Sequence, residues 1–149
     1  MRLLVLGATG MLGHKLLQTL SGQFSVAGTI RGDIEKYRNH PVLNPDLLKG
    51  RISADKLSTI KKALDEYKPD VVINCIGIVK QLPAASDPLQ SIAINALFPH
   101  QLAHICRQRE IRLIHISTDC VFSGRRGNYR EDDFADADDL YGRTKYLGE

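Results

Sequence analysis

A glycine-rich stretch near the start of the chain constrains its fold more than any other feature. The segment GATGMLG, residues 7–13, follows the apolar run 3–6 and precedes leucines at helical spacing. Glycines there allow unusual backbone angles, close approach of a phosphate to the main chain, and tight packing of a helix on a strand. The start of a helix also offers free N–H groups and a positive dipole end. We therefore expect Gly7, Gly10 and Gly13 to shape a dinucleotide-binding turn, although their spacing differs from the usual GxGxxG; the alternative is a plain strand-to-helix turn.

Strand-like and helix-like segments alternate along the rest of the 149 residues. Asp55 is the expected N-cap of one of the helices, and no regular pattern is visible between residues 32 and 49. The alternation predicts an α/β fold, a Rossmann-like doubly wound parallel sheet with helices on both faces. Apolar runs predict strands at 2–7, 24–30, 70–74 and 111–117, and helical periodicity predicts helices at 11–21, 56–67, 89–109 and from about 139.

The composition argues against several classes of protein. A formal charge of +3 without an arginine tract gives no indication of a nucleic-acid partner. No apolar stretch is long enough to span a bilayer, and the first residues do not follow the pattern of a signal peptide. The three cysteines are odd in number and lack CxxC spacing, as is usual for reduced thiols in the cytosol. We expect a cytoplasmic protein with no membrane, nucleic-acid or metal site.

The end of the second predicted strand bears on which dinucleotide binds. The sequence there is Thr29-Ile30-Arg31-Gly32-Asp33. A carboxylate at this point binds the ribose hydroxyls of NAD, whereas an arginine suits the 2′-phosphate of NADP. Arg31 is the first polar side chain after the strand, and a guanidinium pairs bidentately with phosphate. We therefore expect NADP(H) in preference to NAD(H); the alternative is a solvated Arg31, with Asp33 capping a short helix.

Two residues of the last predicted helix suggest proton chemistry. Tyr141 and Lys145 are four residues apart, so their side chains emerge on one face. A nearby cation makes a tyrosine hydroxyl a better proton donor. A Tyr-x-x-x-Lys pair is by itself common on surface helices, but Ser117-Thr118-Asp119 ends an apolar strand and offers a hydroxyl to the same substrate oxygen. Together these residues predict a site that polarises a carbonyl beside a nicotinamide.

Four motifs occur in an order typical of one enzyme family. They are GATGMLG, NCIG at 74–77, STDCVFSG at 117–124 and YGRTK at 141–145. The chain resembles the extended short-chain dehydrogenases/reductases, and its STDCVFSG and YGRTKYLGE segments most resemble the dTDP-4-dehydrorhamnose reductase branch. The resemblance implies that Tyr141 gives a proton to the carbonyl oxygen and Thr118 holds that oxygen. It also implies that Lys145 binds the nicotinamide ribose and makes Tyr141 more acidic.

The cofactor is expected to contact a wider set of residues. Asn95 matches the helix asparagine of the family. The resemblance leaves two alternatives for its role, a structural one and participation in a proton relay. Many relatives have an aspartate near the adenine at the position of Arg51, and this chain does not match them there. Ile52 is therefore only a minor candidate for contact with the adenine. The full set of expected cofactor contacts is Gly7, Thr9, Gly10, Met11, Leu12, Gly13, Arg31, Ile52, Cys75, Ile76, Gly77, Asn95, Tyr141 and Lys145.

The resemblance implies NADPH-dependent reduction of a nucleotide-linked 4-keto sugar, in deoxysugar and surface-polysaccharide biosynthesis. Dehydratases that resemble this chain carry Thr-Asp-Glu where it has Thr118-Asp119-Cys120, and a thiol is a poor replacement for that general base. The alternatives are an epimerase of the same family and a non-catalytic NADP(H)-sensing module. Relatives continue for about as long again, so residues 1–149 are expected to form the NAD(P)-binding N-terminal part of a longer reductase. The expected partner is a nucleotide sugar, a homodimer is a candidate assembly, and the chain alone, without the substrate domain, is expected to be inactive.

Overall fold

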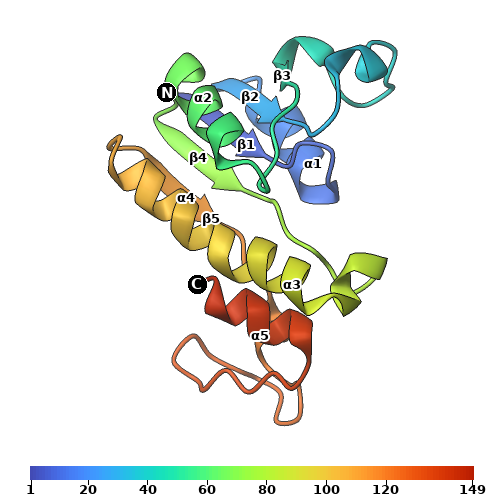
Figure 1. The fold of residues 1–149 in the computed structure, drawn as a ribbon, viewed down its shortest axis with the longest axis vertical. Coiled ribbons are helices and arrows are strands. Elements are labelled where there is room, and N and C mark those ends of the chain that lie inside the picture. Colours follow the sequence, from blue (N-terminus) through green and yellow to red (C-terminus); the bar gives the residue numbers. More distant parts are fainter. The chain divides into compact units, whose positions relative to one another are not determined.

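The computed structural model describes residues 1–149 and contains a five-stranded parallel sheet in the order β3-β2-β1-β4-β5. Residue Leu3 in the central strand pairs with Val26 on one side and Val71 on the other. The sheet confirms the predicted Rossmann-like fold and four predicted strands (Figure 1). The strands are β1 (Arg2–Leu6), β2 (Ser25–Thr29), β3 (Leu48–Lys49), β4 (Val71–Asn74) and β5 (Arg112–His115).

The chain divides into two compact units. The sheet unit comprises residues 1–76 and 103–116 and contains all five strands. The helical unit comprises residues 77–102 and 117–149. None of the helices in either unit is long and apolar enough to cross a membrane.

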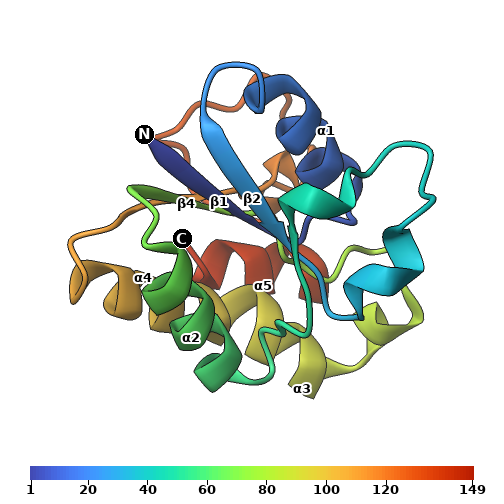
Figure 2. The same ribbon diagram turned by 90° about the horizontal axis from the view of Figure 1, so that it is seen from above.

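In the sheet unit, helices cover both faces of the sheet. Helix α1 (Met11–Leu20) joins β1 to β2, and α2 (Leu57–Tyr67) joins β3 to β4. These two connections run in opposite directions across the sheet, and parallel crossovers are right-handed, so the helices lie on opposite faces. Figure 2 shows β1 and β2 passing between α1 and α2. A doubly wound arrangement of this kind leaves the carboxyl ends of β1 and β4 as the expected ligand crevice.

The central strand explains why the apolar run 3–6 is unbroken. Leu3 and Val5 pack in one cluster with Leu17 of α1. Leu4 and Leu6 point to the opposite face and are fully buried as well. A strand that is covered on both faces needs apolar residues at every position, and each such side chain contributes about 1.5–3 kcal/mol by leaving water.

One strand was not predicted, and one local expectation was wrong. Strand β3 lies inside the segment 32–49, where the sequence showed no pattern, because a two-residue strand is defined by its neighbour and not by periodicity. Asp55 does not cap α2: Lys56 is the N-cap, and the Asp55 carboxylate instead accepts a hydrogen bond from Ser53. The hydroxyl of Thr59, in the first turn, donates to the Lys56 carbonyl.

The helical unit contains the start of the long helix expected over 89–109. Asp87 caps its first turn by accepting hydrogen bonds from Leu89 and Gln90. A π-helical segment that the sequence did not indicate follows, and the remainder crosses into the sheet unit. The last helix begins at Leu140, close to the predicted start, and Asp139 is its N-cap. The helical elements here are η3 (Pro83–Ser86), α3 (Pro88–Ser91), η4 (Ile92–Leu97), α4 (Phe98–Arg107), η5 (Asp119–Val121) and α5 (Leu140–Leu147).

Candidate functional site

The turn between β1 and α1 contains three glycines, and the surrounding structure constrains each of them differently. Gly7 has φ +82°, in the left-handed region, and its carbonyl accepts the Gly10 N–H at 3.0 Å. A Cβ on Gly13 would clash with the Gly7 carbonyl and lie 2.9 Å from its carbon. A Cβ on Gly10 would meet only the Gly7 oxygen, at 3.4 Å. The chain's own backbone conformation and packing therefore require glycine at 7 and 13. Beside Gly10, in contrast, the protein itself leaves room for a side chain.

Thr29, at the end of β2, fixes this turn. Its carbonyl accepts the Ala8 N–H at 2.9 Å, and its hydroxyl accepts the Gly7 N–H at 3.3 Å. Thr29 is only 1% exposed, so these bonds are shielded from water. Helix α1 has no side-chain cap at its N-terminus, and its first residues, Met11 and Leu12, are exposed. The free N–H groups of this helix start are those that a phosphate binds.

Arg31 and Asp33, the two candidates for the ribose end, have different surroundings. Arg31 is exposed and forms no ion pair. The Asp33 carboxylate is paired with Arg51, and the hydrogen bond from that guanidinium lowers the pKa of Asp33. Asp33 precedes the short helix η1 (Ile34–Tyr37) but makes no cap bond to it. Ile52, the weak adenine candidate, is 8% exposed and is tied by its N–H to the Ile30 carbonyl at 3.0 Å.

Cys75 and Ile76 lie directly against the glycine turn. A Cβ on Gly7 would meet Ile76 Cγ1 at 3.2 Å and the Cys75 carbonyl oxygen at 3.3 Å. Asn74, which is fully buried, accepts the Ile76 N–H at 3.1 Å and contacts His115 Nδ1 at 3.0 Å. The sheet unit thus brings Cys75 and Ile76, two of the expected cofactor contacts, against the glycine turn. Asn74 and Thr29 are supporting residues that the sequence did not indicate.

In the helical unit, Asn95 joins two segments through its side chain. Its amide nitrogen donates to the Ile78 carbonyl at 2.9 Å, and its oxygen accepts the Ile78 N–H at 2.8 Å. The same nitrogen lies 3.4 Å from Thr144 Oγ1, on α5. Gly77 is adjacent, since a Cβ there would be 3.5 Å from Asn95 Oδ1. These contacts give Asn95, which is 1% exposed, a structural position between the loop at Ile78 and helix α5.

The three expected catalytic residues all belong to the helical unit. Thr118 is the N-cap of η5, and its hydroxyl accepts the Cys120 N–H at 3.2 Å. Tyr141 and Lys145 are one turn apart on α5; Tyr141 is half-buried and Lys145 is 4% exposed. A Cβ on Gly142 would clash with the Cys120 carbonyl, so the first turn of α5 packs directly on the turn that carries Thr118.

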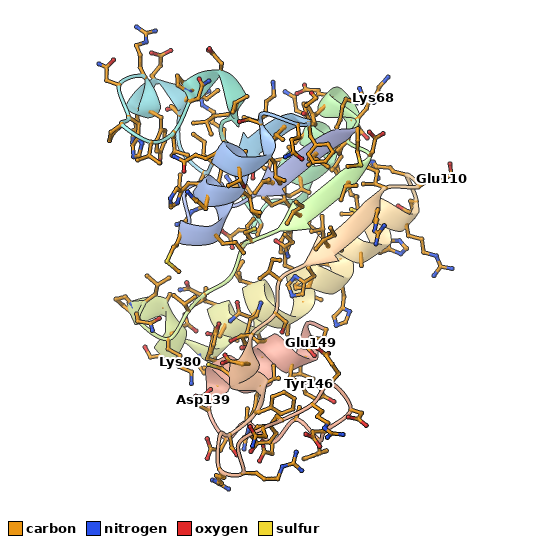
Figure 3. The ribbon with its side chains drawn as sticks, turned by 180° about the vertical axis from the view of Figure 1, so that it is seen from behind. Lys68, Lys80, Glu110, Asp139, Tyr146 and Glu149 are labelled. Carbon is orange, nitrogen blue, oxygen red and sulfur yellow. The ribbon has the colours of Figure 1, made fainter.

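Two charged residues outside the expected catalytic and cofactor sets, Lys80 and Asp139, flank Tyr141. Lys80 Nζ lies 2.6 Å from Asp139 Oδ2 (Figure 3). The same nitrogen lies 5.7 Å from the centroid of the Tyr141 ring. The hydrogen bond between the two charged residues raises the pKa of Lys80 and lowers that of Asp139. Asp139 lies at the expected start of the last helix, and no sequence pattern connects it with Lys80.

A cavity of about 460 Å³ opens beside these residues within the helical unit. One wall holds Phe122 and Tyr129, whose rings stack at 4.6 Å. Ser123 donates to Asp136 from both its N–H and its hydroxyl, at 2.7 Å each, and these bonds lower the pKa of Asp136. The cavity is lined by Lys80, Asp119, Cys120, Phe122, Ser123, Gly124, Tyr129, Ala137, Asp138 and Asp139. Its walls combine charged and hydroxyl groups with an aromatic pair.

Known proteins with similar sequences include reductases of nucleotide sugars. A Haloferax volcanii protein named as a probable low-salt glycan biosynthesis reductase, Agl14, is 35% identical over 97% of this chain and 46% of its own length. The dTDP-4-keto-6-deoxy-D-glucose reductase of Streptomyces niveus is 33% identical over 99% of this chain and 46% of its own. The chain spans about half the length of the curated relatives it matches.

Solved structures share the fold. A hypothetical dTDP-4-dehydrorhamnose reductase from Sulfolobus tokodaii superposes with a TM-score of 0.81 at 27% identity, over 99% of this chain and 50% of its own. Two more distant structures hold dinucleotides. The Bacillus anthracis dTDP-4-dehydrorhamnose reductase contains NADP (TM-score 0.73, 24% identity, 99% of this chain and 47% of its own). The Bordetella bronchiseptica enzyme WbmG contains NAD (TM-score 0.81, 23% identity, 99% and 47%).

A family comparison covers the whole sequence. The family described as RmlD substrate binding domain matches residues 1–149. The chain belongs to the RmlD substrate binding domain family.

Proposed function

We propose that this protein reduces the keto group of a nucleotide-linked 4-keto sugar with NADPH, and that residues 1–149 are the NAD(P)-binding part of that reductase. One observation carries the proposal. Helix α5, with Tyr141 and Lys145 on successive turns, packs on the turn at Thr118 with no room for a side chain at Gly142. This brings a proton-donating helix against a hydroxyl-bearing turn. The names of the related reductases agree with it.

The sheet unit supplies the dinucleotide site. Gly10 leaves open space beside the uncapped start of α1, where the pyrophosphate would accept hydrogen bonds from backbone N–H groups. Arg31 has no ion pair and is available for a 2′-phosphate. Asp33, the carboxylate that would otherwise bind ribose hydroxyls, is held by Arg51. This difference between Arg31 and Asp33 supports NADP(H) over NAD(H).

The helical unit supplies the proton. NADPH, when bound, provides the hydride that reaches the carbonyl carbon. Tyr141 gives its hydroxyl proton to the carbonyl oxygen, which becomes the alcohol of the product. Thr118 hydrogen-bonds the same oxygen, and Lys145 provides a positive charge one turn from the phenolate that Tyr141 becomes. Solvent then returns a proton to Tyr141.

The cavity in the helical unit fits a sugar. Its volume of about 460 Å³ falls in the range of small-molecule sites. Carboxylates at Asp119 and Asp138 can accept hydrogen bonds from sugar hydroxyls, and the stacked rings of Phe122 and Tyr129 present an apolar surface. Cys120 takes the place of a carboxylate beside Asp119, which favours simple reduction over dehydration.

The direct test is a turnover assay with the full-length protein, NADPH and a dTDP-linked 4-keto-6-deoxy sugar. We expect NADPH absorbance at 340 nm to fall as an equal amount of 4-hydroxy product forms. No NADPH consumption with dTDP-, UDP- or GDP-linked keto sugars would overturn the proposal. Tightly bound NAD that survives purification, together with an inverted sugar product, would identify an epimerase instead. Cofactor binding without any turnover would point to a sensing module.

Calorimetry tests the cofactor preference separately. Arg31→Ala should weaken NADPH binding at least about tenfold, since a charge-assisted bond contributes about 1.5–3 kcal/mol, and should leave NADH binding nearly unchanged. Arg112→Ala is the matched control, because Arg112 is an exposed arginine at the opposite end of the sheet strands. Tighter binding of NADH than NADPH by the unaltered protein would contradict the role of Arg31.

A further inference from the structure

We propose that Lys80 is a positioning residue for Tyr141, which it aligns through an ion pair with the N-cap of helix α5. The inference rests on the proposed reductase function. It assigns a role to a residue that lies in a loop far from α5 in the sequence and that no sequence motif marks.

The Asp139 carboxylate is engaged by both of its oxygens. Oδ1 accepts the Gly142 N–H at 2.7 Å, which caps the first turn of α5. Oδ2 lies 2.6 Å from Lys80 Nζ. In Figure 3, Lys80 and Asp139 lie side by side. The orientation of this cap, and with it the first turn of α5, therefore depends on where Lys80 is held.

Lys80 is itself held firmly. Its loop is anchored two residues earlier, where Asn95 bonds both the N–H and the carbonyl of the buried residue Ile78. The turn continues with a hydrogen bond from the Leu82 N–H to the Val79 carbonyl at 3.0 Å. Lys80 thus extends from a fixed loop to the start of α5, and its ammonium group is within cation–π range of the Tyr141 ring, 5.7 Å from the centroid.

The first turn of α5 packs closely against the turn that carries Thr118. A Cβ on Gly142 would clash with the Cys120 carbonyl and lie 2.6 Å from the Ala137 Cβ. A small rotation of this turn would therefore change the position of Tyr141 relative to the turn that carries Thr118. Misplacement of a reacting group by about 1 Å can cost roughly a hundredfold in rate, so a partial loss of alignment should cost about tenfold.

Stability and activity should respond differently to loss of this ion pair. Lys80 and Asp139 are each 45% exposed, and ion pairs of that kind contribute little to folding. Removing one should leave the melting temperature nearly unchanged while it lowers kcat. A residue that only stabilised the fold would show the reverse.

The experiment is a double-mutant cycle on the full-length protein with NADPH and the keto sugar. Lys80→Met removes the cation, and Asp139→Asn keeps an oxygen for the Gly142 N–H but removes the charge. We expect each single variant to lower kcat about tenfold with unchanged KM values, and the double variant to be no worse than either. Lys80→Arg should restore kcat to within about threefold. The matched control is Lys62→Met, on α2, which should have no effect.

Several results would overturn the inference. Unchanged kcat in Lys80→Met would do so, and so would single effects that multiply in the double variant. A rise in sugar KM alone would make Lys80 a substrate contact instead. If the unaltered protein shows no turnover, the proposed function fails, and hydrogen exchange then tests the pair itself: Lys80→Met should speed exchange of the Gly142 amide, and unchanged exchange would refute the contact.

Discussion

Replacing Gly13 by alanine would test the packing of helix α1 on the glycine turn. The added methyl carbon would clash with the Gly7 carbonyl oxygen and lie 2.9 Å from its carbon and 3.0 Å from the Ala8 Cα. Ordinary contact begins at 3.4 Å, and these atoms belong to the backbone, which cannot rotate away. Helix α1 must therefore retreat from β1.

The size of the effect follows from two opposing contributions. In an open helix position, glycine to alanine stabilises by about 1 kcal/mol. Overpacking of this kind costs about 1–3 kcal/mol, and the backbone clash at Gly13 puts it at the upper end. We expect a net loss of about 1–2 kcal/mol in the free energy of unfolding, together with weaker NADPH binding because the N–H groups at the start of α1 are displaced.

Two further glycine variants separate packing from ligand binding. At Gly22, which has no atom within 4 Å of an added Cβ, alanine should leave both stability and NADPH affinity unchanged. At Gly10, where the nearest atom is 3.4 Å away, alanine should change stability by less than about 1 kcal/mol but weaken NADPH binding at least about tenfold. Urea denaturation and calorimetry measure the two quantities. A Gly13→Ala protein that is more stable than the unaltered one would refute the packing argument.

Three other predictions concern residues away from the glycine turn. Asn95→Ala leaves the buried N–H and carbonyl of Ile78 without their partner, and urea denaturation should show a loss of about 2–4 kcal/mol; a loss under about 1 kcal/mol would count against it. The hydrogen bond from Arg109 lowers the pKa of Asp65 below its ordinary value of 3.8. The ionised Asp65 carboxylate therefore stabilises the folded protein above pH 3.8, and this stabilisation is lost as the pH falls through the lowered pKa. Asp65→Asn should therefore have a lower free energy of unfolding than the unaltered protein at pH 7, and the difference should disappear in acid. A difference that does not change with pH would be inconsistent with this. Burial raises the pKa of Cys106 to about 11, so iodoacetamide at pH 8 should modify this cysteine only after unfolding. Peptide mapping distinguishes it from the half-buried Cys75 and Cys120, and rapid labelling of Cys106 itself in the native protein would contradict its buried position.

Much of the sheet could be predicted because two of its strands, β1 and β4, are buried on both faces. The runs around Leu4 and Val72 are apolar at every position, and that pattern is visible without any partner. Strand β3 could not be predicted, because it consists of only two residues. It is a strand because it pairs with β2, as in the hydrogen bond from the Ile30 N–H to the Lys49 carbonyl. Local pattern is informative only where an element is long enough to carry one.

The candidate site shows the same division. The packing role of Gly13 could be predicted from spacing, since a helix that starts directly after a strand must approach it closely. The roles of Thr29 and Lys80 could not, because each acts on a segment distant in sequence: Thr29 on the turn after β1, and Lys80 on Asp139. Such contacts form only when the chain has folded, and no local sequence pattern indicates them.

The most direct test of the central claim removes one oxygen atom from helix α5. Tyr141→Phe deletes the proposed proton donor, whereas Tyr146→Phe, on the same helix and 47% exposed, is the matched control. In the full-length protein with NADPH and a dTDP-linked 4-keto-6-deoxy sugar, we predict that Tyr141→Phe lowers kcat by about 10²–10⁴-fold. Tyr146→Phe should keep the original kcat. A Tyr141→Phe protein that retains the original kcat would contradict the account.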